Sequence, residues 1–373
     1  MTAVRTRLYP PYVATQKRSP LRPLIPLPHT PSELTGPSFG PEDVAPGEED
    51  LTRQHHGEPV GQRILLAGRV LDGARPVPGT LVELWQANAA GRYRHVRDQY
   101  LAPLDPNFTG AGRTLTDREG RYRFVTIRPG PYPWRNHFNA WRPAHIHFSV
   151  FGPNFATRLV TQMYFEGDPL LAVDPIFNSI GDSASSEAMI ARLDWETSEE
   201  YHALGYRYDI DVNAASQTVG PYFSIGLDRG YRDSLGEDVT VSGRLLDGDG
   251  RPVSDGVLEI WQADARGVYG PPFRGFGRVP TDAEGGFRFT TIVPGAVMGP
   301  DGPQAPHLMV SVFGRGILRR LATRMYFPDE AANAADPVLE TVPPDRRHTM
   351  VARPGLTWNV ILQGEDESVF FDI

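Results

Sequence analysis

Two histidines that stand two residues apart, His145 and His147, lie in the segment WRPAHIHFSV (residues 141–150), which otherwise has the pattern of a β-strand. Because side chains at i and i+2 of a strand point to the same face, both imidazoles can reach one ion. Imidazole is a ligand for iron, copper, zinc and nickel. Two tyrosines, Tyr93 and Tyr132, could add phenolate oxygens to such a site.

The tyrosines indicate which metal would suit these four side chains. A phenol, with a pKa of about 10, ionises at neutral pH only where a strong cation holds it, and a trivalent ion does so best. Two phenolates and one hydroxide would cancel the charge of iron(III) and allow its burial. Zinc held by three histidines, or iron(II) with a carboxylate, would need ligands that this stretch does not contain.

The same residues also have an ordinary structural interpretation. A pair of histidines on one strand is commonly half-buried and hydrogen-bonded. Tyr93 and Tyr132 taken alone would be core or interface aromatics. A duplication within the sequence provides the comparison that separates the two interpretations.

Four motifs of the chain occur twice. Residues 68–95, 116–130, 145–152 and 161–169 return as residues 243–270, 281–295, 307–314 and 323–331. Each copy is much longer than the unit of a solenoid. The sequence therefore predicts a duplicated domain, with a first copy at residues 1–212 and a second at residues 213–373.

Residues shared by both copies are expected to maintain the fold, whereas residues found in one copy are candidates for a chemical function. Tyr93 corresponds to Tyr269 and His145 to His307, but Met309 stands where the first copy has His147. The second copy also lacks five residues that surround the histidines of the first, namely Tyr132, Trp134, Arg135, Trp141 and Arg142. Their joint loss indicates one functional site, in the first copy, and one that has been lost.

Short apolar runs separated by turn residues predict a mostly β protein. The segments LVELWQA (81–87) and VLEIWQA (257–263) alternate apolar and polar residues as half-buried strands do. The 38 glycines and 36 prolines are spread between such runs. We expect two homologous antiparallel β-sandwich domains packed together, an extended N-terminal arm at residues 1–63, and one helix at residues 185–196.

Composition excludes several classes of function. The chain has 373 residues and a net charge of −8 without a basic stripe, so nucleic acid and anionic membranes are poor partners. No apolar run approaches the roughly 20 residues that span a bilayer, and the N-terminus lacks a secretory signal, so we expect a cytoplasmic protein. Without cysteine, a metal must be held by His, Tyr or carboxylate.

Longer motifs resemble the protocatechuate 3,4-dioxygenase family of intradiol ring-cleaving enzymes. In that family a catalytic β chain holds non-haem iron(III), and a homologous α chain holds none. The first copy resembles the β chain and the second the α chain, fused in that order. The motifs are LVELWQANAAGRYRH, YLAPLDPNFTGAGR, PGPYPWRN, WRPAHIHF and YFEGDP in the first copy, and SQTVGPYF and ESVFFDI in the second.

The resemblance implies a role for each matching residue. One Fe(III) per chain would be held by Tyr93, Tyr132, His145 and His147, with a water-derived hydroxide. Tyr132 would leave the iron and take a substrate proton, while Arg142, near Gln162, would stabilise negative charge on the ring. The pocket would be lined by Tyr12, Trp134 and Ile176, and closed by residues of the second copy: Thr218, Gly220, Pro221, Tyr222 and Arg315. Arg315 could equally make an ordinary salt bridge.

The implied function is cleavage of protocatechuate (3,4-dihydroxybenzoate) with O2 to 3-carboxy-cis,cis-muconate, in aromatic catabolism by the β-ketoadipate pathway. The substrate could instead be another catechol, such as hydroxyquinol or gallate. Two other classes are a metal-free β-sandwich binding protein and a zinc hydrolase, for which a third ligand is missing. The family also implies a homo-oligomer of the fused chain.

Overall fold

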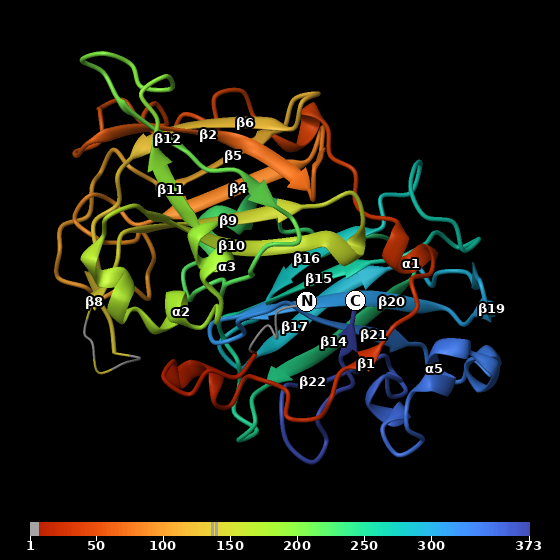
Figure 1. The fold of residues 1–373 in the computed structure, drawn as a ribbon. Coiled ribbons are helices and arrows are strands. Elements are labelled where there is room, and N and C mark those ends of the chain that lie inside the picture. The colour runs from red at the N-terminus through yellow and green to blue at the C-terminus, as the bar shows by residue number, and fades with distance from the viewer. Residues whose placement is uncertain (1–6, 136–137, 139–140) are drawn as a thin grey trace. The chain divides into compact units, whose positions relative to one another are not determined.

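The computed structural model describes residues 7–135, 138 and 141–373, and it divides into two compact units (Figure 1). The first unit comprises Met1–Val13, Ser38–Gly152 and Thr157–Arg229, and the second Ala14–Pro37, Pro153–Ala156 and Gly230–Ile373. The units are therefore not the same ranges as the two predicted copies, since residues 213–229 belong to the first unit and residues 14–37 to the second. No helix in the described part of the chain is both long and apolar enough to cross a bilayer.

A sheet of ten strands makes up most of the first unit. Its order is β13-β2-β12-β11-β10-β9-β4-β5, and β3 and β6 also pair with β2. The strands are β2 (Arg63–Asp72), β3 (Arg75–Pro76), β4 (Leu81–Gln86), β5 (Ala111–Leu115), β6 (Arg121–Ile127), β9 (His145–Phe151), β10 (Arg158–Phe165), β11 (Ile190–Leu193), β12 (Leu204–Arg207) and β13 (Ile210–Asp211). The remaining elements are the paired strands β7 (Tyr132–Pro133) and β8 (Trp141–Arg142), and the helices α2 (Pro175–Asn178), α3 (Ser183–Glu187) and α4 (Ser224–Leu227).

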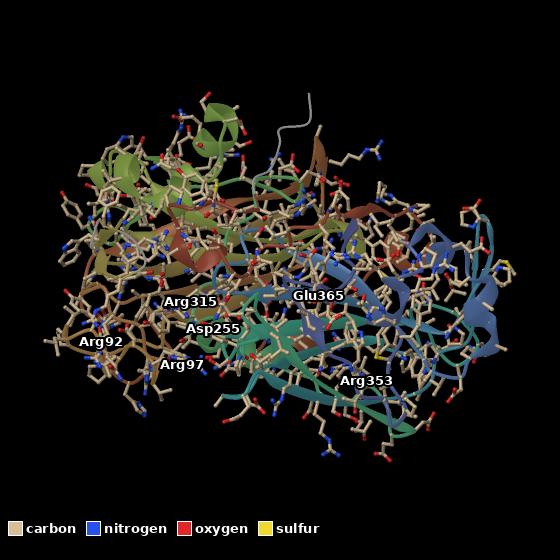
Figure 2. The ribbon with its side chains drawn as sticks, turned by 90° about the horizontal axis from the view of Figure 1, so that it is seen from below. Arg92, Arg97, Asp255, Arg315, Arg353 and Glu365 are labelled. Carbon is tan, nitrogen blue, oxygen red and sulfur yellow. The ribbon has the colours of Figure 1, made fainter. Side chains whose placement is uncertain are left out.

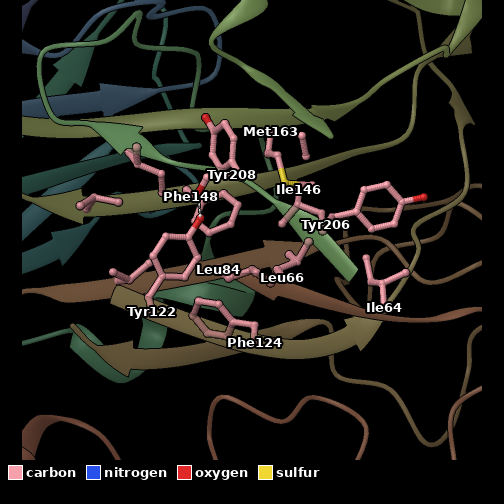
Figure 3. Packing of buried hydrophobic residues seen from close by; sticks show 14 of the residues in the cluster. Ile64, Leu66, Leu84, Tyr122, Phe124, Ile146, Phe148, Met163, Tyr206 and Tyr208 are labelled. Atoms are coloured by element: carbon pink, nitrogen blue, oxygen red, sulfur yellow. Dashed lines mark hydrogen bonds between the residues drawn. The ribbon is translucent and has the colours of Figure 1, made fainter. Parts of the chain in front are cut away.

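Strands of this sheet pack around an apolar core (Figure 3). Leu66 on β2 and Phe124 on β6 pack in one cluster with Leu84 on β4, Phe148 on β9 and other buried side chains. Burying each such side chain contributes about 1.5–3 kcal/mol. The core thus holds β9 between β4 and β10, with which it pairs along both edges.

The core of the second unit lies between two separate sheets. A six-stranded sheet runs β1-β23-β21-β20-β15-β16 and a three-stranded sheet β17-β14-β22, and side chains of both sheets form one cluster. The strands are β1 (Ile25–Pro26), β14 (Val239–Leu246), β15 (Gly256–Trp261), β16 (Phe276–Pro280), β17 (Gly286–Thr291), β20 (His307–Gly314), β21 (Leu321–Tyr326), β22 (Val360–Ile361) and β23 (Phe371–Asp372). The pair β18 (Val297–Gly299) and β19 (Gly302–Gln304) and the helices α1 (Pro31–Leu34) and α5 (Pro337–Thr341) complete it.

The expectation of a mostly β protein built from sandwiches is confirmed. However, not all of its strand pairs are antiparallel, as had been expected. Most pairs are antiparallel, but β2 pairs in parallel with β12 and β13, β10 with β11, β14 with β22, and β1 with β23. Long segments, rather than hairpins, connect the strands of these pairs. Alternation of apolar residues gives no strand direction, so the sequence could not indicate them.

The predicted helix at residues 185–196 is wrong beyond its first turn. Helix α3 covers Ser183–Glu187, where the Asp182 side chain accepts a hydrogen bond from the Ser185 amide at 2.8 Å. The chain then forms β11, with Ile190 paired with Tyr164 of β10. A single helical turn is costly to form alone, and pairing along β10 satisfies the backbone groups that follow it.

A short N-terminal segment contributes a buried ion pair to the second unit. Thr30 caps α1, and its hydroxyl and the Glu33 carboxylate form a capping box. Glu33 Oε1 lies 2.6 Å from Arg324 Nη2 on β21, and both side chains are fully buried. Residues 14–37 of the expected arm are therefore an integral part of this unit.

Replacing Glu33→Gln should destabilise the second unit by about 3–5 kcal/mol, because it leaves the Arg324 guanidinium buried without a counter-charge. Denaturation by guanidinium chloride, followed by tryptophan fluorescence, measures this loss. Glu199→Gln is the control, because Glu199 pairs with Arg123 on the surface, where an ion pair contributes at most about 1 kcal/mol. Equal destabilisation by the two variants would contradict the prediction.

Candidate metal centre

Strand β9 holds its two histidines on one face and its apolar residues on the other. Ile146, Phe148 and Val150 belong to the core of the first unit. His145 and His147, which alternate with them, are buried on the opposite face with their ring centroids 5.1 Å apart. The indole of Trp85 on β4 stacks on the His147 ring at 5.0 Å. The expected placement of both imidazoles on one face is therefore what the structure contains.

Two tyrosines from separate segments meet the first histidine. Tyr93 Oη lies 3.4 Å and Tyr132 Oη 3.3 Å from His145 Nε2. Their rings contact edge to face, with centroids 5.6 Å apart. Gly91, at φ +79°, permits this approach, since a Cβ there would overlap the carbonyl of Pro131.

Hydrogen bonding leaves a lone pair of His145 directed at the tyrosines. His145 Nδ1 lies 2.7 Å from the carbonyl oxygen of Pro143 and donates to it, so the proton of the neutral ring is assigned to Nδ1 and Nε2 is bare. Such an outer hydrogen bond is typical of a histidine that binds a metal. Within the described part of the chain, His147 Nδ1 is buried without a hydrogen-bond partner.

Burial keeps all four side chains neutral in the absence of a cation. Desolvation, followed by the charge of Arg142, lowers the pKa of His145 and of His147 well below the usual value. Desolvation also raises the pKa of Tyr132, and raises that of Tyr93 further. The imidazoles are therefore ready to bind a metal, whereas the phenols need a strong cation to replace their protons.

This donor set fits a hard, highly charged metal ion. Two neutral nitrogens and two ionisable oxygens converge in one buried place, where two phenolates would offset the charge of the ion. Among residues 7–135, 138 and 141–373, no group of three or more His, Asp and Glu could hold a metal. The ligands Tyr93, Tyr132, His145 and His147 stay a prediction that this geometry supports.

A buried guanidinium lies beside the four ligands. Arg142 Nη1 is 3.3 Å from His145 Nε2, and Nη2 donates to Gln162 Oε1 at 3.0 Å. Asp174 accepts hydrogen bonds from Arg142 Nε at 3.2 Å and Nη2 at 2.8 Å, and Tyr164 Oη lies 3.2 Å from Nη2. A positive charge is thereby fixed beside the predicted ligands, where it can stabilise a bound anion.

The three residues predicted to form the pocket wall are arranged around this arginine. The Arg142 guanidinium lies over the Trp134 ring at 5.3 Å, and Trp134 contacts the buried Tyr12 ring at a centroid distance of 5.7 Å. Ile176 is buried in α2, two residues after Asp174. An apolar wall beside a charged group is the usual make-up of a small-molecule site.

Four residues near the start of the second copy were predicted to close the site, and they lie in the first unit with the predicted ligands: Thr218, Gly220, Pro221 and Tyr222. Gln162 Nε2 donates to the carbonyl of Thr218 at 3.0 Å. Gly220 has φ +74°, and a Cβ there would lie 3.3 Å from the His147 ring, so only glycine combines this backbone with this approach. Pro221 follows it, and the Tyr222 ring is 4.8 Å from the Tyr93 ring.

Arg315 belongs to the second unit. Its Nε donates to Asp255 Oδ2 at 2.8 Å (Figure 2), and Asp255 also pairs with Arg18. The salt bridge considered for it in the sequence is present. Its predicted role in closing the substrate site stays a prediction.

Sequence reasoning missed four side chains that contact the predicted site. These are Trp85 on His147, His95 with its ring 5.2 Å from Tyr222, and Tyr164 and Asp174 on Arg142. Trp85, Tyr164 and Asp174 have identical counterparts in Trp261, Tyr326 and Asp336. The comparison of the copies assigned shared residues to the fold, so it could not find them.

The corresponding place in the second unit is filled by the protein itself. His307 Nε2 lies 2.8 Å from Ser32 Oγ, to which the Tyr269 hydroxyl donates at 2.9 Å. Gln304 and Arg324 stand where the first copy has Arg142 and Gln162, so the guanidinium and the amide have exchanged strands. The Nε2 atom of His307 is therefore engaged in a hydrogen bond, as expected for a lost site.

Replacing His147→Met, which installs the residue of the second copy, should remove the bound metal, because one of the two nitrogens is lost. Metal per chain, measured by inductively coupled plasma mass spectrometry, should fall at least tenfold, because losing even an outer hydrogen-bonding partner of a ligand typically costs about 10–100-fold in metal affinity. His307→Gln in the second unit is the matched control and should keep its metal. Equal metal content in the two variants would exclude His147 as a ligand.

Comparison with known proteins relates the chain to one family. The pattern of the dioxygenase family matches residues 34–214 and again residues 225–367. The protocatechuate 3,4-dioxygenase beta chain of Burkholderia cepacia is 56% identical over 214 residues, which are 57% of this chain and 91% of that one. The alpha chain of the same organism is 44% identical over 192 residues, 42% of this chain and 96% of that one, and matches the other half.

Similar chains also occur among solved structures. The 3-chlorocatechol 1,2-dioxygenase of Rhodococcus opacus 1CP is 24% identical, with a TM-score of 0.34, and the match covers 48% of this chain and 70% of that chain.

Proposed function

Because this chain belongs to the dioxygenase family, which matches it twice, we propose that it is an intradiol dioxygenase acting on protocatechuate. O2 would be added across the bond between the two hydroxylated carbons, giving 3-carboxy-cis,cis-muconate with both oxygen atoms in the product. Similarity to both a beta and an alpha chain of protocatechuate 3,4-dioxygenase supports this substrate. The observation that carries the proposal is the convergence of two phenols and Arg142 on His145 Nε2.

The family uses non-haem iron, and we propose one Fe(III) per chain, held by Tyr93, Tyr132, His145 and His147. When bound, the ion supplies Lewis acidity toward the two catechol oxygens and orients the ring. The pKa of both phenols is raised by burial, so they favour a cation strong enough to replace two protons. This requirement supports a trivalent ion over a divalent one.

We assign proton transfer to Tyr132 rather than to Tyr93. Tyr93 is fully buried, whereas Tyr132 is half-buried and lies on β7, whose ladder with β8 has only two residue pairs. Tyr132 is therefore the easier of the two to displace. In its phenolate form, its Oη would accept a proton from a hydroxyl of the incoming catechol, which then carries the negative charge.

The surrounding residues would orient the ring and exclude water. Arg142 Nη1 offers a fixed positive charge to the anionic ring. Apolar surface and backbone groups would come from Tyr12, Trp134 and the segment at residues 218–222. These groups would distinguish a catechol that carries a ring carboxylate from one that carries hydrogen at the same carbon. A water-poor site strengthens each of these interactions.

Fusion would place the β-like and α-like parts at a fixed one-to-one ratio and a high effective concentration. We propose that the fused chains associate into a homo-oligomer and act in the cytoplasm. Size-exclusion chromatography with light scattering measures the assembly.

Iron-loaded protein should consume one O2 per 3,4-dihydroxybenzoate and form a product with the mass of the substrate plus two oxygen atoms. An oxygen electrode and mass spectrometry after turnover under ¹⁸O2 measure both quantities. Hydroxyquinol, catechol and gallate serve as alternative substrates, and a higher kcat/KM for one of them would reassign the substrate. Absence of cleavage for every catechol would overturn the proposal.

Replacing Tyr132→Phe should shift the visible absorption band of the iron-loaded protein, because one of two tyrosinates that transfer charge to iron(III) is lost. It should also lower kcat by about 10²-fold, the low end for loss of a general acid–base group. Tyr269→Phe in the second unit is the control and should change neither. An unchanged spectrum in the Tyr132 variant would exclude it as a ligand.

A further inference from the structure

We infer that Asp174 is a positioning residue for catalysis, which turns one nitrogen of Arg142 toward the ligand group and holds it there. The inference rests on the proposed function, because the nitrogen acts on the substrate of that reaction. Asp174 is distant from Arg142 in the sequence and is fully buried, as is nearly all of Arg142.

The hydrogen bonds of Arg142 divide its nitrogens into two groups. Asp174 binds the guanidinium along one edge, through Nε at 3.2 Å and Nη2 at 2.8 Å. Gln162 and Tyr164 also accept from Nη2, at 3.0 and 3.2 Å. Because the guanidinium is planar and rigid, fixing two nitrogens fixes the third. Nη1 is thereby directed at His145 Nε2, 3.3 Å away.

Charge gives a second reason for a carboxylate at this position. A guanidinium beside a metal cation is repelled by it, and a buried guanidinium is costly without a counter-charge. A two-point interaction with a carboxylate is among the strongest available to arginine. Asp174 therefore offsets the burial of Arg142 and resists its displacement from the metal.

Asp174 is itself held rigidly by the start of α2. It is the N-cap of that helix, and its Oδ2 accepts from the Phe177 amide at 3.3 Å. Pro175 follows it as the first residue of the helix. A carboxylate fixed by a helix terminus is a better anchor than one on a mobile chain.

The second unit contains the same carboxylate without this function. Asp336 caps α5 through the Val338 and Leu339 amides, each at 2.8 Å, and accepts from the Tyr326 hydroxyl at 3.1 Å. Gln304 stands where the first copy has Arg142, and Arg324 instead pairs with Glu33. The cap and the tyrosine contact thus belong to the fold. Of the two capping aspartates, Asp174 is the one that accepts hydrogen bonds from two nitrogens of a guanidinium.

The experiment compares Asp174→Asn with Asp336→Asn, which make the same change at equivalent helix caps. In Asp174→Asn, kcat for 3,4-dihydroxybenzoate should fall by about 10²-fold, the scale for losing one aligned donor. The dissociation constant for the same compound, from anaerobic titration of the visible spectrum, should change by less than about fivefold. Asp336→Asn should leave kcat within about twofold. It should lower the melting temperature less than Asp174→Asn does, because only Asp174→Asn also leaves a buried guanidinium without its counter-charge.

A double-mutant cycle tests whether Asp174 acts through Arg142. Adding Asp174→Asn to Arg142→Gln should lower kcat by less than about threefold further, because the positioned group is already absent. A full additional loss in that background, an equal loss in Asp336→Asn, or an unchanged kcat in Asp174→Asn would each overturn the inference.

Two further measurements distinguish a misfolded variant, a wrong inference and a wrong proposed function. If Asp174→Asn does not fold, Tyr164→Phe removes the hydroxyl between Asp174 and Arg142 Nη2 while the helix cap remains. That variant should lower kcat severalfold, with Tyr326→Phe as its control, and unchanged rates in both would overturn the inference. Unmodified protein that cleaves no catechol would instead overturn the proposed function.

Discussion

Strand β9 places alternate side chains in two environments, and the candidate metal centre depends on this alternation. Ile146, Phe148 and Val150 are buried in the core, and His145 and His147 emerge on the other face. A shift of one residue in the register would move the histidines into the core and three large apolar side chains into the site. The free energy of the apolar core therefore also fixes the two imidazoles, through pairing with β4 and β10.

Burial then sets the chemistry of the centre. Desolvation lowers the pKa of both imidazoles and raises the pKa of both phenols, so all four groups are neutral. The nitrogens can then bind a metal directly, whereas the phenols bind only a cation strong enough to replace their protons. The same low-polarity surroundings would make Arg142 costly without Asp174. Ligands, guanidinium and carboxylate are thus one electrostatic system, whose members have to be buried together.

The duplication shows that the same fold persists where the residues of the candidate site have been replaced. Both units keep the strand registers, with His147 opposite Gln162 and Met309 opposite Arg324. In the second unit a methionine stands in place of one predicted ligand, and Ser32 of the N-terminal segment is hydrogen-bonded to both His307 and Tyr269. The fold is preserved because its apolar core does not depend on what fills this place.

Much of the centre could be predicted from the sequence, because its information is local. A period of two places His145 and His147 on one face, and the copies differ at Tyr132, Trp134 and Arg142. Turn residues between short apolar runs indicated the mostly β fold. The resemblance of whole motifs added Tyr12, Gln162 and residues 218–222.

The tertiary structure alone decided the remainder. Asp174 and Tyr164 occur in both copies, so nothing in the sequence distinguished the carboxylate that binds a guanidinium from the one that only caps a helix. The strand β11, within the segment expected to be a helix, depends on a free edge of β10. These features arise from contacts between residues far apart in the chain, which local patterns of residue type do not encode.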